Sequence, residues 1–200
     1  MSIKEILNNI LTEVSEQIDA INEIQLNEFK NAIIKAKHLF LAGTGRSGLM
    51  ISAFANRLMH LGLNVSLISE ISKPRANKGD LLILGSNSGE TKSLIAYAQQ
   101  AKKLGVKVIL LTTNSTSTLA KLADNIVVIP IKVVKLNQPM GSIFEQLSLL
   151  TYDSLIYSLM ESLQQTPDVM KMRHANIEWF LHFVHKTYRI WESFIKMHKF

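Results

Sequence analysis

Short apolar runs alternate with amphipathic segments between residues 38 and 129, and this alternation constrains the fold more than any other feature. Apolar runs without polar interruption are typical of strands that are buried on both faces. The segments of helical period between them supply the layers that cover the sheet, which predicts a parallel sheet between two layers of helices. The runs that we predict as strands are 38–42, 64–69, 81–84, 106–111 and 126–129.

Helices are predicted between these strands and at both ends of the chain. Residues 2–24 carry an apolar stripe at helical spacing, so we expect a long helix that packs on the domain or on a partner subunit. A loop over 131–141 precedes a second long helix, 142–164. The predicted fold class is α/β, a three-layer α/β/α domain with a five-stranded parallel sheet that covers residues 1–178. The other predicted helices are 26–36, 48–61, 90–104, 116–123 and 168–178.

Composition and charge narrow the classes of function. The chain has 200 residues and no cysteine, which excludes disulfides and cysteine-based metal sites. No apolar run approaches the length of a membrane span, and the first residues do not resemble a secretory signal, so we expect a cytoplasmic protein without a membrane partner. Half of the net charge of +6 lies in residues 179–200, an aromatic and basic tail, so a nucleic-acid partner is not favoured.

The loop after the first predicted strand, residues 43–48, has the spacing G-x-G-x-x-G. With Glu70 about twenty residues further on, this spacing is typical of dinucleotide-binding domains. Arg46 and Ser47, however, place a cation and a hydroxyl in the turn, and the C-terminal region is too short for a separate catalytic domain. A small phosphorylated ligand is therefore favoured over a dinucleotide.

A second polar loop, residues 86–91, follows the third predicted strand and precedes a helix. The N–H groups and the positive dipole end of such a helix attract anions. Asn87 could serve only to adopt a left-handed turn, and Gly89 could serve only close packing. A single helix cap needs one hydroxyl, whereas this loop has three, which favours a phosphate site. The hydroxyl residues are Ser86, Ser88 and Thr91.

The two loops together resemble the sugar isomerase (SIS) family of phosphosugar-binding domains. Further segments look like the 6-phospho-3-hexuloisomerases within that family, and the resemblance covers roughly residues 1–178. The most specific of these segments are Pro-Met-Gly-x-x-Phe-Glu at 139–145 and Arg-His-Ala-Asn at 173–176. The others are 53–63, 78–82 and 117–124.

The resemblance implies a flavodoxin-like fold and an isomerase that interconverts D-arabino-3-hexulose 6-phosphate and fructose 6-phosphate, a step of the ribulose monophosphate pathway. The reaction would pass through a cis-enediol without a metal or any other cofactor. The resemblance also implies a homo-oligomer, either a dimer or a tetramer. Two alternatives remain open, namely another SIS phosphosugar isomerase, such as one acting on arabinose 5-phosphate, and a non-catalytic module that senses a sugar phosphate.

Carried over residue by residue, the resemblance implies that Glu145 is the enediol base and that His174 is an acid/base. Ser142 and Glu145 also have the spacing of a capping box, which would make the glutamate structural. His174 could be a surface residue, and it could reach the loops only if the C-terminal segment folds back or a neighbouring subunit donates it. The residues expected to bind the phosphosugar are Gly45, Arg46, Ser47, Ser86, Asn87, Ser88, Gly89, Glu90, Thr91, Met140 and Gly141.

Overall fold

The structure is a computed structural model that describes residues 1–131 and 138–177. The predicted tail, 179–200, lies outside the described residues, as do residues 132–137 of the predicted loop. The domain boundary that we expect at residue 178 therefore stays a prediction.

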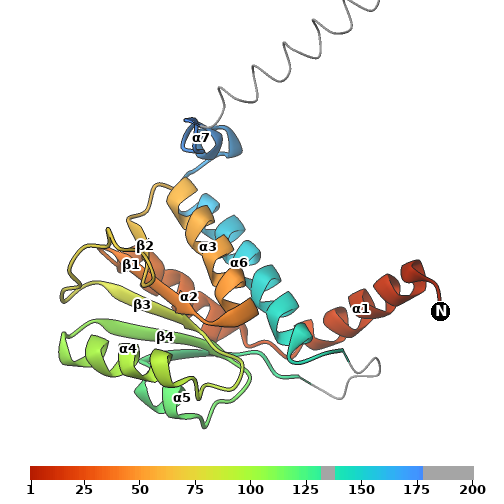
Figure 1. The fold of residues 1–200 in the computed structure, drawn as a ribbon. Helices are drawn as coiled ribbons and strands as arrows, with labels where there is room; N and C mark the ends of the chain where they lie inside the picture. The colour runs from red at the N-terminus through yellow and green to blue at the C-terminus, as the bar shows by residue number, and fades with distance from the viewer. Residues whose placement is uncertain (132–137, 178–200) are drawn as a thin grey trace, which may run out of the picture.

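One five-stranded parallel sheet forms the centre of the fold, with the strand order β2-β1-β3-β4-β5 (Figure 1). Every neighbouring pair in this sheet is parallel, which confirms the predicted fold class. The strands are β1 (Leu39–Gly43), β2 (Val65–Leu67), β3 (Leu81–Gly85), β4 (Lys107–Thr112) and β5 (Asn125–Val128).

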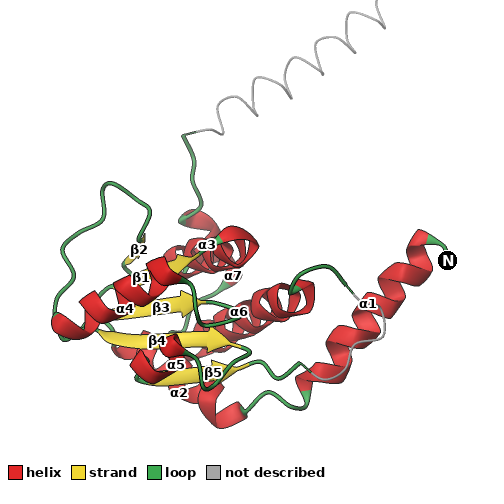
Figure 2. Cartoon of the chain, turned by 60° about the horizontal axis from the view of Figure 1, so that its bottom comes forward, coloured by secondary structure: helices red, strands yellow, loops and turns green. Residues whose placement is uncertain are grey.

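Seven helices are described, and those around the sheet form two layers (Figures 1 and 2). Within the described ranges, none of them combines the length and apolarity that a membrane crossing requires. The helices are α1 (Ile3–Ile18), α2 (Glu23–Lys35), α3 (Gly45–His60), α4 (Lys92–Lys103), α5 (Thr118–Leu122), α6 (Ser142–Ser162) and α7 (Pro167–Met172).

Each face of the sheet has its own hydrophobic core because successive strand residues point to opposite faces. Leu39 and Leu41 of β1 pack in the cluster that contains the buried residues of α2, α3 and α6. Phe40 and Ala42 pack in the cluster that contains those of α4 and α5. Burial on both faces explains why the strands are apolar without interruption.

The predicted N-terminal helix over 2–24 is shorter in the structure. It ends at Ile18, and a second helix begins at Glu23. Asn22 is the N-cap of α2, and its side-chain oxygen accepts hydrogen bonds from two N–H groups of the first turn. This cap starts a new helix, and α1 points away from the sheet (Figure 1).

Helix α3 begins at Gly45, three residues earlier than predicted. A Cβ on Gly43 would lie 3.0 Å from the Cα of Gly48, so the strand and the helix cross in close contact. This crossing leaves little room for a loop, and Arg46 and Ser47 consequently lie in the first turn of α3. The predicted helix over 168–178 is also shorter and ends at Met172.

Candidate active site

The two polar loops meet at the carboxyl ends of β1 and β3. The chain passes from β1 to the edge strand β2 and then returns to β3 on the other side of β1, so the strand order reverses here. Gly43 and Gly85, the last residues of the two strands, are paired in register. Ligands of open α/β sheets bind at such a switch point, so this is where the structure places the candidate site.

The loop 86–91, here called the serine loop, is held by its own hydroxyl groups. The Ser86 hydroxyl accepts a hydrogen bond from the Gly89 N–H at 3.2 Å and lies 3.4 Å from the Thr91 hydroxyl. The Ser88 hydroxyl accepts from the Glu90 N–H at 3.2 Å. Thr91 is the N-cap of α4 but makes no side-chain cap hydrogen bond, so its hydroxyl does not occupy the first-turn N–H groups.

Asn87 attaches the serine loop to the end of β4. Its backbone carbonyl accepts hydrogen bonds from the hydroxyls of Thr112 and Thr113, and its side-chain oxygen accepts from Thr113 at 2.9 Å. The alternative that Asn87 serves a left-handed turn is wrong, because the described non-glycine residues with positive φ are Met140 and Gln164. The amide side chain therefore has a specific role in holding the loop.

Gly89 and Glu90 of the serine loop contact the start of α5. Gly89 has a φ of +68°, and a Cβ there would lie 2.1 Å from the Ser117 hydroxyl oxygen, so it is a packing glycine. The Glu90 carboxylate accepts a hydrogen bond from the Thr118 N–H at 2.8 Å. This bond lowers the pKa of Glu90 below its usual value. The Glu90 side chain thus holds the start of α5, rather than extending freely toward a ligand.

Substitution of Gly89 by alanine is expected to disrupt the serine loop. The new methyl group would overlap Ser117, and the positive φ adds strain, so we expect a loss of about 2–4 kcal/mol in the free energy of unfolding. Inorganic phosphate should bind more weakly. Gly105→Ala is the matched control, because its φ is +71° but its nearest neighbour atoms are 3.8 Å away. Equal loss of stability in both variants, measured by urea denaturation, would contradict the packing role.

Glu145 lies in the first turn of α6, where it pairs with Arg46. The distance between Arg46 Nη1 and Glu145 Oε2 is 2.8 Å, and the side chains are 50% and 11% exposed. Arg46 also donates to the Ser142 hydroxyl at 3.0 Å. The structure therefore brings a residue expected to bind phosphate into contact with the residue expected to be the base.

The capping-box interpretation of Glu145 is wrong. Gly141, in a left-handed conformation with φ +74°, is the N-cap of α6, and Ser142 is already the first helical residue. The Ser142 hydroxyl donates to the Pro139 carbonyl at 2.6 Å instead of capping the helix. The glutamate is thus available for the ion pair with Arg46 because the helix starts one residue earlier than a capping box requires.

The turn before α6 contacts the serine loop. A Cβ on Gly141 would lie 2.7 Å from the Asn87 side-chain nitrogen, which shows how closely the two segments approach. Met140, the preceding residue, is 95% exposed. Arg46, Asn87, Gly141 and Glu145 are therefore neighbours in space, although they come from three separate parts of the sequence.

The SIS domain family matches residues 32–152. The chain belongs to the SIS family. The 3-hexulose-6-phosphate isomerase of Bacillus subtilis (strain 168) is 42% identical over 185 residues, which are 89% of this chain and 100% of that protein. The protein of the same name from Mycobacterium gastri is 34% identical over 178 residues, or 86% of this chain and 89% of that protein.

A solved structure also supports the assignment to the SIS family. The crystal structure of a Methanococcus jannaschii protein, with an inferred molecular function of 3-hexulose-6-phosphate isomerase, aligns with a TM-score of 0.76. It is 33% identical and covers 86% of this chain and 96% of that chain. The predicted SIS family and its fold are therefore confirmed, and the parallel sheet with its serine loop can be described as an SIS domain.

A cavity of about 110 Å³ beside residues 43–48 has polar lining residues that the sequence analysis does not identify. It lies at the carboxyl ends of β1 and β2 and is bounded on its other side by α4. Ser93 could have been found from sequence, since it falls two residues after the serine loop, whereas the others have no local signal. The missed polar residues are Thr44, Ser52, Ser69, Ser93 and Tyr97.

His174 lies far from Glu145 within one SIS domain. Its ring stacks on that of His60, with centroids 5.2 Å apart, in a cavity of about 340 Å³. His60 is the last residue of α3 and Arg46 lies in the first turn, so the two ends are separated by roughly 20 Å along the helix. Burial, followed by the charges of His174 and Arg57, lowers the pKa of His60. The described C-terminal segment does not bring His174 to the loops.

Proposed function

We propose that this chain is a 3-hexulose-6-phosphate isomerase, which interconverts D-arabino-3-hexulose 6-phosphate and fructose 6-phosphate. The observation that carries the proposal is the Arg46–Glu145 ion pair, which places a nearly buried carboxylate beside the serine loop. A base next to a phosphate site is what an enediol isomerase needs. The relatives named 3-hexulose-6-phosphate isomerase, up to 42% identical, support this substrate.

The phosphate of the substrate would be held by hydroxyl groups and by the N–H groups at the start of α3 and α4. With the phosphate fixed, C2 of the sugar would be presented to Glu145, and Arg46 would hold the carboxylate in its orientation before the substrate arrives. The hydroxyls that we assign to the phosphate are those of Ser47, Ser86, Ser88 and Thr91.

The chemical step would move the carbonyl group from C3 to C2. Glu145 would take the proton from C2, so that the electron pair of the C–H bond forms the double bond of the enediol and the C3 oxygen gains a proton. The carboxylic acid would then return its proton to C3, while the O2 proton leaves and the carbonyl forms at C2. His174 would carry the proton between the two oxygens.

His174 can contribute to the reaction only at the site of a second copy of the chain, because Glu145 of the same chain lies at the other end of α3. Arg46 contacts Glu145 where both helices begin, and Arg57 and His60 share a cavity with Ile156 and Met160 further along α6. The helices α3 and α6 therefore run in the same direction. A twofold axis across them would bring the His174 end of one copy to the Glu145 end of the other.

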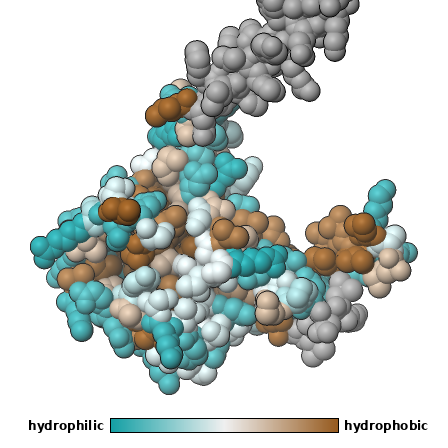
Figure 3. Space-filling view, viewed as in Figure 1, coloured by the Kyte–Doolittle hydropathy of each residue, from teal (hydrophilic) through white to brown (hydrophobic). Residues whose placement is uncertain are grey.

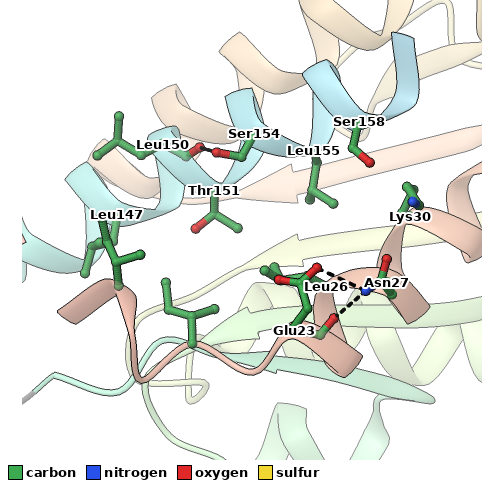
Figure 4. A pocket seen from close by; sticks show the side chains of 12 residues that line it. Glu23, Leu26, Asn27, Lys30, Leu147, Leu150, Thr151, Ser154, Leu155 and Ser158 are labelled. Atoms are coloured by element: carbon green, nitrogen blue, oxygen red, sulfur yellow. Dashed lines mark hydrogen bonds between the residues drawn. The ribbon is translucent and has the colours of Figure 1, made fainter. Parts of the chain in front are cut away.

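Exposed apolar surface supports the homo-oligomer. Figure 3 shows a hydrophobic patch on α1, whose exposed residues include Ile3, Leu7 and Leu11. Between α2 and α6, Leu26, Leu150 and Leu155 line a further cavity of about 260 Å³ (Figure 4). Apolar surface of this extent needs cover, and we propose that other copies of the chain provide it.

A coupled assay tests the proposed function directly. D-arabino-3-hexulose 6-phosphate is supplied to the purified protein, and the formation of fructose 6-phosphate is followed with and without EDTA. We expect turnover that EDTA does not change. Arabinose 5-phosphate serves as the competing substrate, and turnover of that sugar alone would assign a different SIS isomerase.

A further inference from the structure

The turn that precedes α6 has a strained backbone, which the residues around it must stabilise. Met140 and Gly141, the two residues before the helix, have φ values of +32° and +74°. A non-glycine residue in this region costs about 1–2 kcal/mol, so the turn persists only if its surroundings fix it. Because Glu145 follows by four residues, the turn also sets the position of its carboxylate. Asn87 of the serine loop contacts one side of the turn.

A series of hydrogen-bonded polar side chains holds Gln138, the residue directly before the turn. Gln138 donates from Nε2 to Oε2 of Glu13 on α1 at 3.0 Å. Gln146, the neighbour of Glu145 on α6, donates from Nε2 to Oε1 of Gln138, also at 3.0 Å. Gln138 is therefore held between α1 and α6, directly before the strained turn.

Glu13 is an unusual residue for its position. Most of α1 is exposed, but Glu13 is only 4% exposed, and its backbone carbonyl accepts a hydrogen bond from the Gln17 side chain. Burial of a carboxylate is costly unless the charge is hydrogen-bonded. A hydrogen bond to a charged acceptor is stronger than one between neutral groups, which suits Glu13 to fix Gln138.

We propose that Glu13 is a positioning residue for the isomerase reaction. Acting through Gln138 and Gln146, it fixes the turn at 139–141 and so holds Glu145 where it meets Arg46. This inference rests on the proposed role of Glu145 as the base. It assigns to α1, a helix that lies outside the serine loop and the sheet, an indirect effect on the rate of the chemical step.

The variant Gln138→Glu is designed to disrupt the hydrogen bonds that link Glu13, Gln138 and Gln146. The new carboxylate would face Glu13 at hydrogen-bond distance, and two like charges there repel each other. We expect kcat to fall about tenfold or more, because a small displacement of a catalytic group has effects of this size. KM should change less than kcat, because the hydroxyl groups of the serine loop are not substituted. Gln138→Met, which removes both hydrogen bonds without adding charge, should lower kcat in the same direction.

A second substitution distinguishes positioning from a general loss of structure. In the double variant Glu13→Gln, Gln138→Glu, the carboxylate at 138 can accept from the amides at 13 and 146, so both hydrogen bonds re-form with one direction reversed. We expect kcat to return to within about threefold of wild type. The matched control is Glu16→Gln, Gln138→Glu, which removes an exposed carboxylate of the same helix and should not restore kcat.

Hydrogen exchange gives a readout that does not depend on the substrate. The Glu145 N–H donates to the Gly141 carbonyl at 3.2 Å, so exchange of the amides in 142–146 reports the start of α6. These amides should exchange faster in Gln138→Glu and regain protection in the Glu13→Gln double variant. This holds even if the wild-type chain turns over another sugar, so failure of the proposed function would be seen separately in the coupled assay.

Three results would overturn the inference. The first is a wild-type kcat in Gln138→Met. The second is that Glu13→Gln and Glu16→Gln restore the kcat of Gln138→Glu equally well. The third is that the amides of 142–146 keep their wild-type protection from hydrogen exchange in Gln138→Glu. If Gln138→Glu does not fold, the comparison is made with Gln138→Met and with the Glu13→Gln double variant, which must fold and be active.

Discussion

Replacement of Glu145 by glutamine is expected to lower kcat about 10³-fold, while KM for the phosphosugar stays within a few-fold of wild type. Glutamine has the shape of glutamate and its side-chain oxygen can still accept from Arg46, but it cannot take the C2 proton. Because the serine loop and its hydroxyls are not changed, the substrate should still bind. Steady-state kinetics in the coupled assay, with substrate affinity measured by calorimetry, gives both quantities.

The matched control for this substitution is Glu161→Gln, an exposed glutamate near the other end of the same helix. It should leave kcat and KM unchanged. Turnover by Glu145→Gln at the wild-type rate would remove Glu145 from the mechanism and would revive the alternative of a module that binds a sugar phosphate without acting on it.

Two inactive variants are expected to recover activity when they share one oligomer. Glu145→Gln and His174→Ala should each lose activity by about 10²–10⁴-fold. If His174 acts on the partner's site, a mixed dimer contains one site with an intact Glu145 and an intact His174. Random mixing of equal amounts should therefore restore about a quarter of wild-type activity.

The control for this complementation is a mixture of His174→Ala with the double variant Glu145→Gln, His174→Ala, which contains no intact site. Light scattering and native mass spectrometry establish that mixed oligomers have formed. If they form and the first mixture stays inactive, His174 does not act between subunits, and the histidine is a residue of the His60 cavity only.

Much of the fold could be predicted from local patterns. Strands such as 81–84 are apolar without interruption because both of their faces are buried, so their signal lies within a few residues. The serine loop is equally visible, because three hydroxyl residues lie close together at one helix start. The errors were at boundaries, as at Gly45 and Asn22, where close packing and a cap decided the first helical residue.

The residues that form the candidate site are harder to predict from the sequence than the fold. The spacing of Ser142 and Glu145 is the same in a capping box as in this helix, and only the left-handed Gly141 distinguishes them. The proximity of Gly89 to Ser117 likewise has no local pattern. A glycine that is needed for packing cannot be told from a flexible one until its neighbour in space is known.

The amino-acid sequence alone predicts the alternation of strands and helices, the serine loop and the resemblance to the SIS family, because each depends on residues close together in the chain. Which distant residues meet is known only from the folded chain. Arg46 and Glu145 are 99 positions apart, and Glu13 and Gln138 are 125 apart. Such contacts follow from how helices pack on the sheet, and the same packing separates His174 from Glu145 within one chain.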